Sequence, residues 1–325
     1  MPRDLNSLRA SLLAAATSMA WAIQRDAGDA IIDQLANGPL DGQTRAAEPG
    51  ADDVQAAAIH PATLAAVSRR EGAVVVIPVQ GIIANRQTFM DYIMGQNVVP
   101  PFALVNAVEA AVADPEVKAV VIAYDTPGGV TGGVPEAHAR LMACRGRGTP
   151  IIAQVVGQCG SAGYWLASAA DELVMTESAV AGSIGAYMPH VDLSGAYAQA
   201  GVAKVYVEAP QGGHKTEGHD GAPLGEEARA HVQELVDDAY ALFVRDVAKG
   251  RGVAESVVRG DQYGRGRVYT AARCVERGMA DKVRSLSDTL AALGAVSSPA
   301  PVSASRSGRS IAMAEQQARL SGITL

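Results

Sequence analysis

The chain has 325 residues, of which 48% are hydrophobic and 19% charged, enough apolar material for one large domain or two ordinary ones. Its formal net charge of -7 and its lack of a clustered basic stretch argue against nucleic-acid binding, because phosphate contacts need a positive surface. No apolar run approaches the roughly 20 residues that a membrane span requires. The three cysteines lack metal-ligand spacing, so we expect no disulfide framework, no metal site and a reducing compartment.

The N-terminal residues predict an arm that precedes the main domain. A basic and then apolar stretch imitates a signal peptide, but Asp4 interrupts its basic part, and the apolar pattern continues past Trp21 to Leu35. We therefore expect an amphipathic helical arm over residues 1–35. Residues 36–70 are rich in Gly, Pro, Asp and Ala and predict a linker.

From residue 71 the chain alternates between short apolar runs and helical patterns. Strands are predicted at residues 73–79, 119–124, 151–156, 173–175 and 202–207, and helices at residues 102–112 and 135–144. Strands that alternate with helices of this length need crossover connections. The pattern therefore predicts an α/β fold with a mainly parallel sheet covered on both faces.

The C-terminal third predicts helices followed by a tail. A long amphipathic helix begins near Leu224 and is stopped by Gly250, and Thr270 is placed to cap a last helix that closes at Gly278. Beyond Ser285 the composition turns to Ser, Pro, Ala and Arg. We therefore expect a compact domain over residues 71–285 and a flexible, low-complexity tail over residues 286–325.

Two glycine-rich turns each follow a predicted buried strand, where sites form in parallel sheets. Pro127-Gly128-Gly129 exposes backbone N–H groups that could stabilise an oxyanion. Ser161 lies between a strand and a helix, in Cys159-Gly160-Ser161-Ala162-Gly163, where its hydroxyl would be exposed and the Ala162 N–H would be a second donor. A helix N-cap at Ser161 and an ordinary surface turn at Pro127 would produce the same patterns. Cys159 is better explained by packing than by chemistry.

A nucleophilic serine needs a base, and the residues alone leave two candidates. His138 and His231 fall within helical patterns, where solvated faces are expected, whereas His190 follows an apolar segment and could face the site. Lys215 lies in an irregular glycine-rich loop at residues 212–218 without an evident structural task. A desolvated lysine can act as a neutral base, so Lys215 and His190 remain rivals on chemistry alone.

Five elements in one order resemble the signal peptide peptidase A (SppA) family. They are Thr126-Pro127-Gly128-Gly129, Gly160-Ser161-Ala162-Gly163-Tyr164, Gly182-Ser183-Ile184-Gly185, Gly213-His214-Lys215 and Cys274-Val275-Glu276-Arg277-Gly278-Met279-Ala280-Asp281. The resemblance covers about residues 72–285. It implies the ClpP/crotonase-like fold, built from repeated ββα units, and a serine peptidase that needs no metal or other cofactor. It also implies a Ser–Lys dyad with Ser161 as nucleophile and Lys215 as general base. The Gly128 or Gly129 amide and the Ala162 amide would form the oxyanion hole.

The arm and tail resemble the phage-encoded branch of this family, whose members cleave scaffold, portal or their own tails during capsid maturation. That resemblance implies protein substrates, a location in the host cytoplasm or prohead, and a ring-shaped homo-oligomer. In some members the lysine reaches the serine of a neighbouring subunit. The long helix and residues 86–100 are the expected contacts. Ala162 departs from the family's usual glycine but still supplies an N–H.

Four alternatives stay open at this point. They are a Ser161–His190 pair of ClpP type, a crotonase-type acyl-CoA enzyme, a non-catalytic shell protein, and a bacterial enzyme that degrades membrane-derived peptides. The first three differ from the Ser–Lys scheme in the residue that would act as base or in their need for a reactive serine. The fourth differs only in its substrate.

Overall fold

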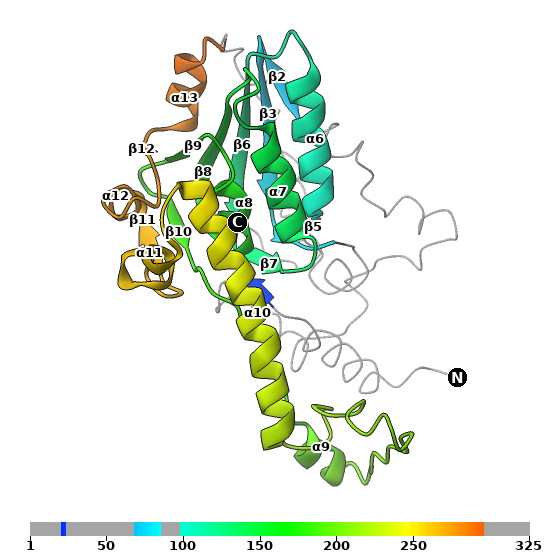
Figure 1. Ribbon diagram of the computed structural model, residues 1–325. Coiled ribbons are helices and arrows are strands. Elements are labelled where there is room, and N and C mark those ends of the chain that lie inside the picture. The colour runs from blue at the N-terminus through cyan, green and yellow to red at the C-terminus, as the bar shows by residue number, and fades with distance from the viewer. Residues whose placement is uncertain (1–20, 24–67, 86–97, 296–325) are drawn as a thin grey trace, which may run out of the picture. The chain divides into compact units, whose positions relative to one another are not determined.

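The computed structural model describes residues 21–23, 68–85 and 98–295 of the chain (Figure 1). Its centre is a sheet in which β3 (Val74–Gln80), β6 (Ala119–Thr126) and β8 (Ile151–Gly160) are parallel neighbours. These strands contain the first three apolar runs of the sequence. Their β-branched residues suit a sheet buried on both faces.

The remaining strands of this eight-stranded sheet extend it on either side. They are β2 (Arg69–Glu71), β9 (Glu172–Met175), β10 (Val180–Gly182), β11 (Val268–Thr270) and β12 (Lys282–Val283). The long strand β8 pairs in parallel with β9 along its first half and with β10 along its second half. Antiparallel pairing occurs only where β2 joins β3 and β11 joins β10. The predicted mainly parallel sheet is confirmed.

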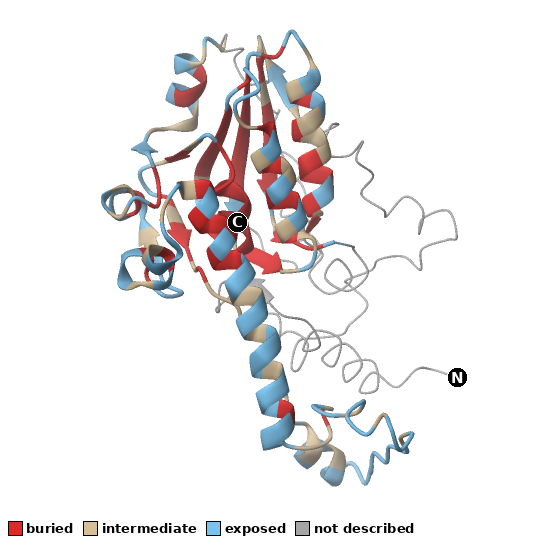
Figure 2. Ribbon diagram, in the orientation of Figure 1, coloured by how far each residue is buried: buried red, intermediate tan, exposed pale blue. Residues whose placement is uncertain are grey.

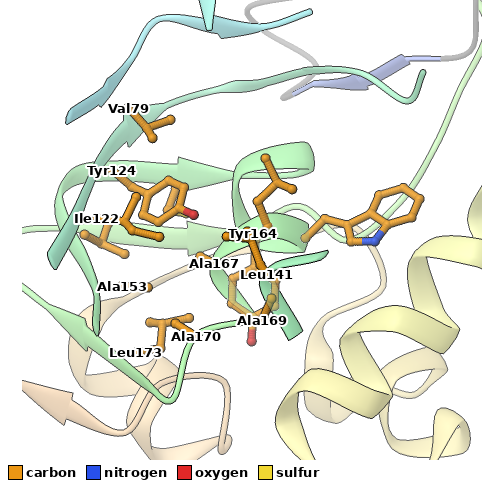
Figure 3. Packing of buried hydrophobic residues seen from close by; sticks show 14 of the residues in the cluster. Val79, Ile122, Tyr124, Leu141, Ala153, Tyr164, Ala167, Ala169, Ala170 and Leu173 are labelled. Carbon is orange, nitrogen blue, oxygen red and sulfur yellow. The ribbon is translucent and has the colours of Figure 1, made fainter. Parts of the chain in front are cut away.

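Helices cover both faces of this sheet, as predicted. One face carries α6 (Pro101–Ala113), α7 (Val134–Cys144), α8 (Ala162–Ala167) and the C-terminal half of α10 (Glu226–Arg251). Figure 3 shows part of this cluster, including Ile122 and Tyr124 of β6 together with Leu141 of α7. The other face packs against α13 (Leu286–Ala292), whose Leu290 contacts the outward-alternating residues of the same strands. This arrangement is the ClpP/crotonase-like α/β fold that the resemblance implies.

A second, four-stranded sheet has the order β1-β7-β4-β5. The strands are β1 (Trp21–Ile23), β4 (Ile82–Ile83), β5 (Val98–Val99) and β7 (Gly128–Val130). Each of β4 and β7 follows a strand of the large sheet after a single residue. Gly129 permits a very close approach between β7 and β4, because a Cβ there would lie 1.8 Å from the Ile83 carbonyl oxygen. The smaller elements are α9 (Ser194–Gln199), α11 (Glu255–Arg259), a 3-10 turn (Asp261–Tyr263) and α12 (Ala271–Glu276).

Three sequence predictions differ from the structure. Residues 21–23 are extended and pair with β7, where a helical arm was predicted; the rest of that arm and nearly all of the linker lie outside the described residues. Residues 202–207 form no strand and are exposed, since nothing in the described chain pairs with them. The packed chain continues through α13, so the tail predicted from residue 286 begins too early. Ser285 starts α13 by accepting a hydrogen bond from the Asp288 N–H.

The helix α10 is anchored to the body only through its C-terminal half. Trp165 of α8 stacks on Phe243, with ring centroids 4.4 Å apart, and its Nε1–H donates to Asp246 Oδ2 at 3.0 Å. Gly250 lies against α8, where a Cβ would come within 2.3 Å of the Ser168 carbonyl oxygen. The N-terminal half of α10 is largely exposed (Figure 2). None of the described helices is long and apolar enough to span a membrane.

Substituting Gly250 should test this anchor. We expect Gly250→Ala to lower the free energy of unfolding by about 2–3 kcal/mol, because backbone must move to admit the methyl group. The measurement is denaturant unfolding followed by circular dichroism. Gly195→Ala is the matched control, since Gly195 is also helical and its Cβ would meet nothing within 4 Å. Equal stability of the two variants would contradict the close packing described.

Candidate active site

Ser161 stands at the sharp turn between β8 and α8. Its backbone has φ 53° and ψ -117°, a conformation that residues with a Cβ avoid. The Ser161 N–H donates to the Gly182 carbonyl at 2.8 Å, and its own carbonyl accepts from the Trp165 N–H at 2.9 Å. The pairing of β10 with β8 and the first turn of α8 thus hold the strained residue from both sides. The predicted strand-to-helix elbow is present.

The Ser161 hydroxyl is fully buried and has no hydrogen-bond partner among the described residues. A helix N-cap would accept a hydrogen bond from the first turn of α8, but the Ser161 side chain makes none. The N-cap explanation therefore does not account for the residue. Leaving a buried hydroxyl unpaired costs about 1–3 kcal/mol, a cost typical of sites shaped for chemistry.

The Pro-Gly-Gly turn is brought beside the serine elbow, because β7 packs against α8. Thr126 connects the two turns. Its hydroxyl accepts a hydrogen bond from the Gly128 N–H at 3.1 Å, and its methyl group lies where a Cβ on Gly163 would come within 2.5 Å. Gly128 itself has φ 105°, which favours glycine. The sequence motif contained Thr126, but nothing in its pattern indicated this bridging position.

Among the candidate oxyanion donors, the Gly128 amide is thus already engaged by Thr126. The Ala162 amide follows Ser161 at the start of α8, and Ala162 is fully buried. Gly129 is the next residue of β7 and cannot carry a side chain without displacing Ile83. The structure therefore brings Ser161, Ala162 and the two glycines into one region.

Lys215 lies elsewhere within the same chain. It is exposed, and its neighbour His214 approaches Glu227 at the start of α10, with 4.0 Å between Nε2 and Oε1. By contrast, α8 meets α10 at Phe243. Residues 227 and 243 of a helix are separated by about 24 Å, from a rise of 1.5 Å per residue. One chain therefore does not bring Lys215 to its own Ser161.

The region around Lys215 forms a small lobe, residues 188–225, held by its own polar contacts. Asp220 is its centre: the side chain accepts a hydrogen bond from the Tyr197 hydroxyl at 2.6 Å and is ion-paired with Lys204. Its carbonyl also accepts from the Leu193 N–H at 2.7 Å. The lobe is thus an ordered platform for the Lys215 loop, although nothing buries the lysine itself.

The histidines have other partners. His190 lies in the lobe, where its Nε2 is 3.2 Å from the Ala222 carbonyl oxygen. His138 is buried beside Ser168, 3.3 Å from its Oγ, so the prediction of a solvated face for His138 is wrong, whereas His231 is exposed as expected. Burial lowers the pKa of His138 to about 4. The stretch that holds His60 is outside the described residues.

Cys159 precedes the elbow and is fully buried. Burial raises the pKa of its thiol well above the usual range, so the sulfur stays protonated near neutral pH. A thiol nucleophile at this position is therefore disfavoured, in agreement with the packing role expected from the sequence.

A parallel α/β sheet with an elbow serine beside a glycine turn defines a class of proteins suited to acyl transfer. Comparison with known proteins narrows this class: residues 143–297 match Peptidase family S49. The chain carries a domain of this peptidase family.

Its curated relatives include phage proteins. The chain is 29% identical over 229 residues to "Head-tail preconnector protein GP5" of Enterobacteria phage P21, covering 70% of this chain and 44% of that protein. It is 26% identical over 217 residues to "Capsid assembly protease C" of Escherichia phage lambda, covering 67% and 48%. It is 28% identical over 180 residues to "Putative signal peptide peptidase SppA" of Enterococcus faecium, covering 55% and 51%. The chain thus spans about half the length of these curated relatives.

The pKa of His138 leads to a pH-dependent stability. Because the folded pKa is about 4 and an unfolded histidine titrates near 6.5, the unfolded state binds the extra proton between these values. We expect the wild type to lose about 1.4 kcal/mol of unfolding free energy per pH unit, relative to His138→Gln, as the pH falls from about 6 to 4.5. Denaturant titrations at several pH values give the difference, in which the other ionisable groups cancel. A difference that does not change with pH would mean that the folded protein accepts the proton.

Proposed function

We propose that the protein is a serine endopeptidase that uses Ser161 as nucleophile and Lys215 of a second copy as general base. The observation that carries the proposal is the Ser161 hydroxyl, which is buried, strained at its backbone and without a hydrogen-bond partner beside the glycine turn. Membership of a peptidase family supports the reaction class. The choice of Lys215 rests on the resemblance of its loop to the SppA motif.

The reaction begins when neutral Lys215 accepts the Ser161 Oγ proton and Oγ attacks the carbonyl carbon of a substrate peptide. The oxyanion accepts hydrogen bonds from the Ala162 amide and from Gly129 or Gly128. The lysine ammonium then protonates the leaving amine as the C–N bond breaks, which leaves an ester on Ser161. Water gives a proton to the lysine and attacks the ester, releasing the acid and restoring the serine hydroxyl. Because lysine accepts a proton only when neutral, activity should rise towards alkaline pH.

The separation of Lys215 from Ser161 along α10 is the reason for invoking a second copy. The N-terminal half of α10 carries apolar residues that the described chain does not fully cover. They are Val232, Leu235, Val236, Ala239 and Leu242. The neighbouring segment 202–207 leaves Val205 82% and Val207 95% exposed. Exposed β-branched residues in a row favour pairing with another chain. We therefore propose a ring-shaped homo-oligomer in which the lobe of one subunit covers the elbow of the next.

The proposed substrates are proteins of an assembling phage capsid, namely scaffold, portal or the chain's own tail. Support comes from the relatives named as a capsid assembly protease and a head-tail preconnector protein. The corresponding place of action is the host cytoplasm or the prohead interior. A relative named as a putative signal peptide peptidase keeps a second substrate class, membrane-derived peptides, in view. Co-expression of wild type or Ser161→Ala with neighbouring capsid genes, followed by mass spectrometry, decides between them through the processed products.

The dyad is tested by single substitutions. Ser161→Ala and Lys215→Ala should each lower kcat/KM for a peptide substrate by about 10⁴-fold, because nucleophile and base act as one unit. Lys118→Ala is the matched control, since its ammonium donates only to the Pro115 carbonyl at the edge of the domain. His190→Ala tests the rival base. Full activity of Lys215→Ala together with inactive His190→Ala would replace the lysine by the histidine.

Sharing of the site between subunits is tested by mixing. Ser161→Ala and Lys215→Ala proteins are each inactive, but a mixed ring places intact Lys215 of one subunit beside intact Ser161 of the next. Equal mixing with subunit exchange should restore about one quarter of wild-type activity, the fraction of neighbouring pairs with both groups intact. A mixture of Ser161→Ala with the double variant is the control. No recovery in demonstrably mixed oligomers would show that both groups come from one chain.

A further inference from the structure

The strand that carries the glycine turn has a partner from far away in the sequence. β1 pairs with β7 in antiparallel fashion, with Trp21 opposite Val130, Ala22 opposite Gly129 and Ile23 opposite Gly128. The other edge of β7 is occupied by β4, with Ile83 opposite Gly129. Residues 21–23 therefore fill the one remaining edge of β7, at the two glycines themselves.

That edge is where the backbone of a peptide substrate would lie. For attack, the scissile carbonyl must lie within reach of Ser161 and the nearby amides at the same time. β7 packs against α8, which begins just after Ser161, so a peptide paired with β7 would run past the elbow. An extended segment that adds to an open strand edge gains main-chain hydrogen bonds that do not depend on its sequence. Residues 21–23 already have this extended, antiparallel arrangement.

We infer that residues 21–23 are an internal occupant of the peptide-binding edge of β7, and that an extended polypeptide substrate must displace them before cleavage. This inference rests on the proposed peptidase function. The occupant is this chain's own β1, and the ligand that replaces it is a segment of unfolded or extended polypeptide.

The pairing is short enough to be reversible. Three residues form only a few ladder hydrogen bonds, each worth about 1 kcal/mol net. Attachment to the same chain compensates, because it gives the segment an effective concentration of the order of millimolar. A substrate then competes with β1, and its apparent affinity falls by the fraction of molecules with a free edge. The expected kinetic sign is a raised KM with an unchanged kcat.

A reversible cross-link in the full-length protein tests the pairing. Residues directly opposite in an antiparallel pair have Cα atoms about 4.5–5.5 Å apart, within the range of a disulfide. Trp21 and Val130 are such a pair. We expect the W21C/V130C double variant to form an intramolecular disulfide on mild oxidation, identified by peptide mass mapping. Peptide cleavage should fall at least about tenfold on oxidation and return on reduction, because the locked strand excludes substrate.

The single variants W21C and V130C, each measured oxidised and reduced, are the controls. The native cysteines Cys144, Cys159 and Cys274 are all buried, which limits competing cross-links. In a second arm, Ala22→Pro removes a backbone N–H and fixes φ away from the extended value of an antiparallel strand, so KM should fall several-fold at constant kcat. Ala22→Ser keeps the N–H and should keep the parental KM.

The outcomes separate the two proposals. Failure of the disulfide to form, or a complete disulfide that leaves cleavage unchanged, would overturn the occupancy of the substrate edge. So would an unchanged KM in Ala22→Pro. If the disulfide forms but no variant, including wild type, shows cleavage dependent on Ser161, the peptidase proposal and the competitive role fall together, while the pairing of β1 with β7 remains.

Discussion

The rest of the site depends on the backbone of Ser161, which is held in a conformation that an L-amino acid normally avoids. The Ser161 N–H is tied to Gly182 of β10, and every residue of the short helix α8 behind it is buried, so the turn cannot relax outwards. Thr126 adds a third restraint, because it contacts both the Gly128 amide and the space left by Gly163. The result is a hydroxyl fixed in a buried position with no partner of its own, which the proposed dyad would use.

The same rigidity makes the single chain incomplete. Trp165 belongs to α8 and holds α10 through Phe243 and Asp246, so the direction of the long helix is set by the packing next to the nucleophile. The helix then leads away from the body towards the lobe that carries Lys215. Because Asp220 gives that lobe its own polar centre, it need not fold back onto the domain to be ordered. A second copy of the chain satisfies both features at once.

β7 is the element on which nucleophile, substrate and N-terminal segment converge. Its backbone is close to β4 on one side, where Gly129 excludes any side chain, and is paired with β1 on the other. A strand with one edge permanently occupied can bind a further peptide only at the second edge. Competition at that edge would couple substrate access to the N-terminal segment without any change in the elbow.

The amino-acid sequence by itself determined the central strands, the main helices and the elbow, because buried β-branched runs bounded by glycine and amphipathic stripes are local properties. It did not determine what covers each element. Residues 202–207 have the composition of a buried strand yet are exposed, and α13 was concealed by a Ser- and Ala-rich composition although Leu290 closes one face of the sheet. The pairing of β1 with β7 and the distance of Lys215 from Ser161 were decided only by the tertiary structure. Contacts between segments far apart in sequence depend on how all the elements pack, which no local pattern records.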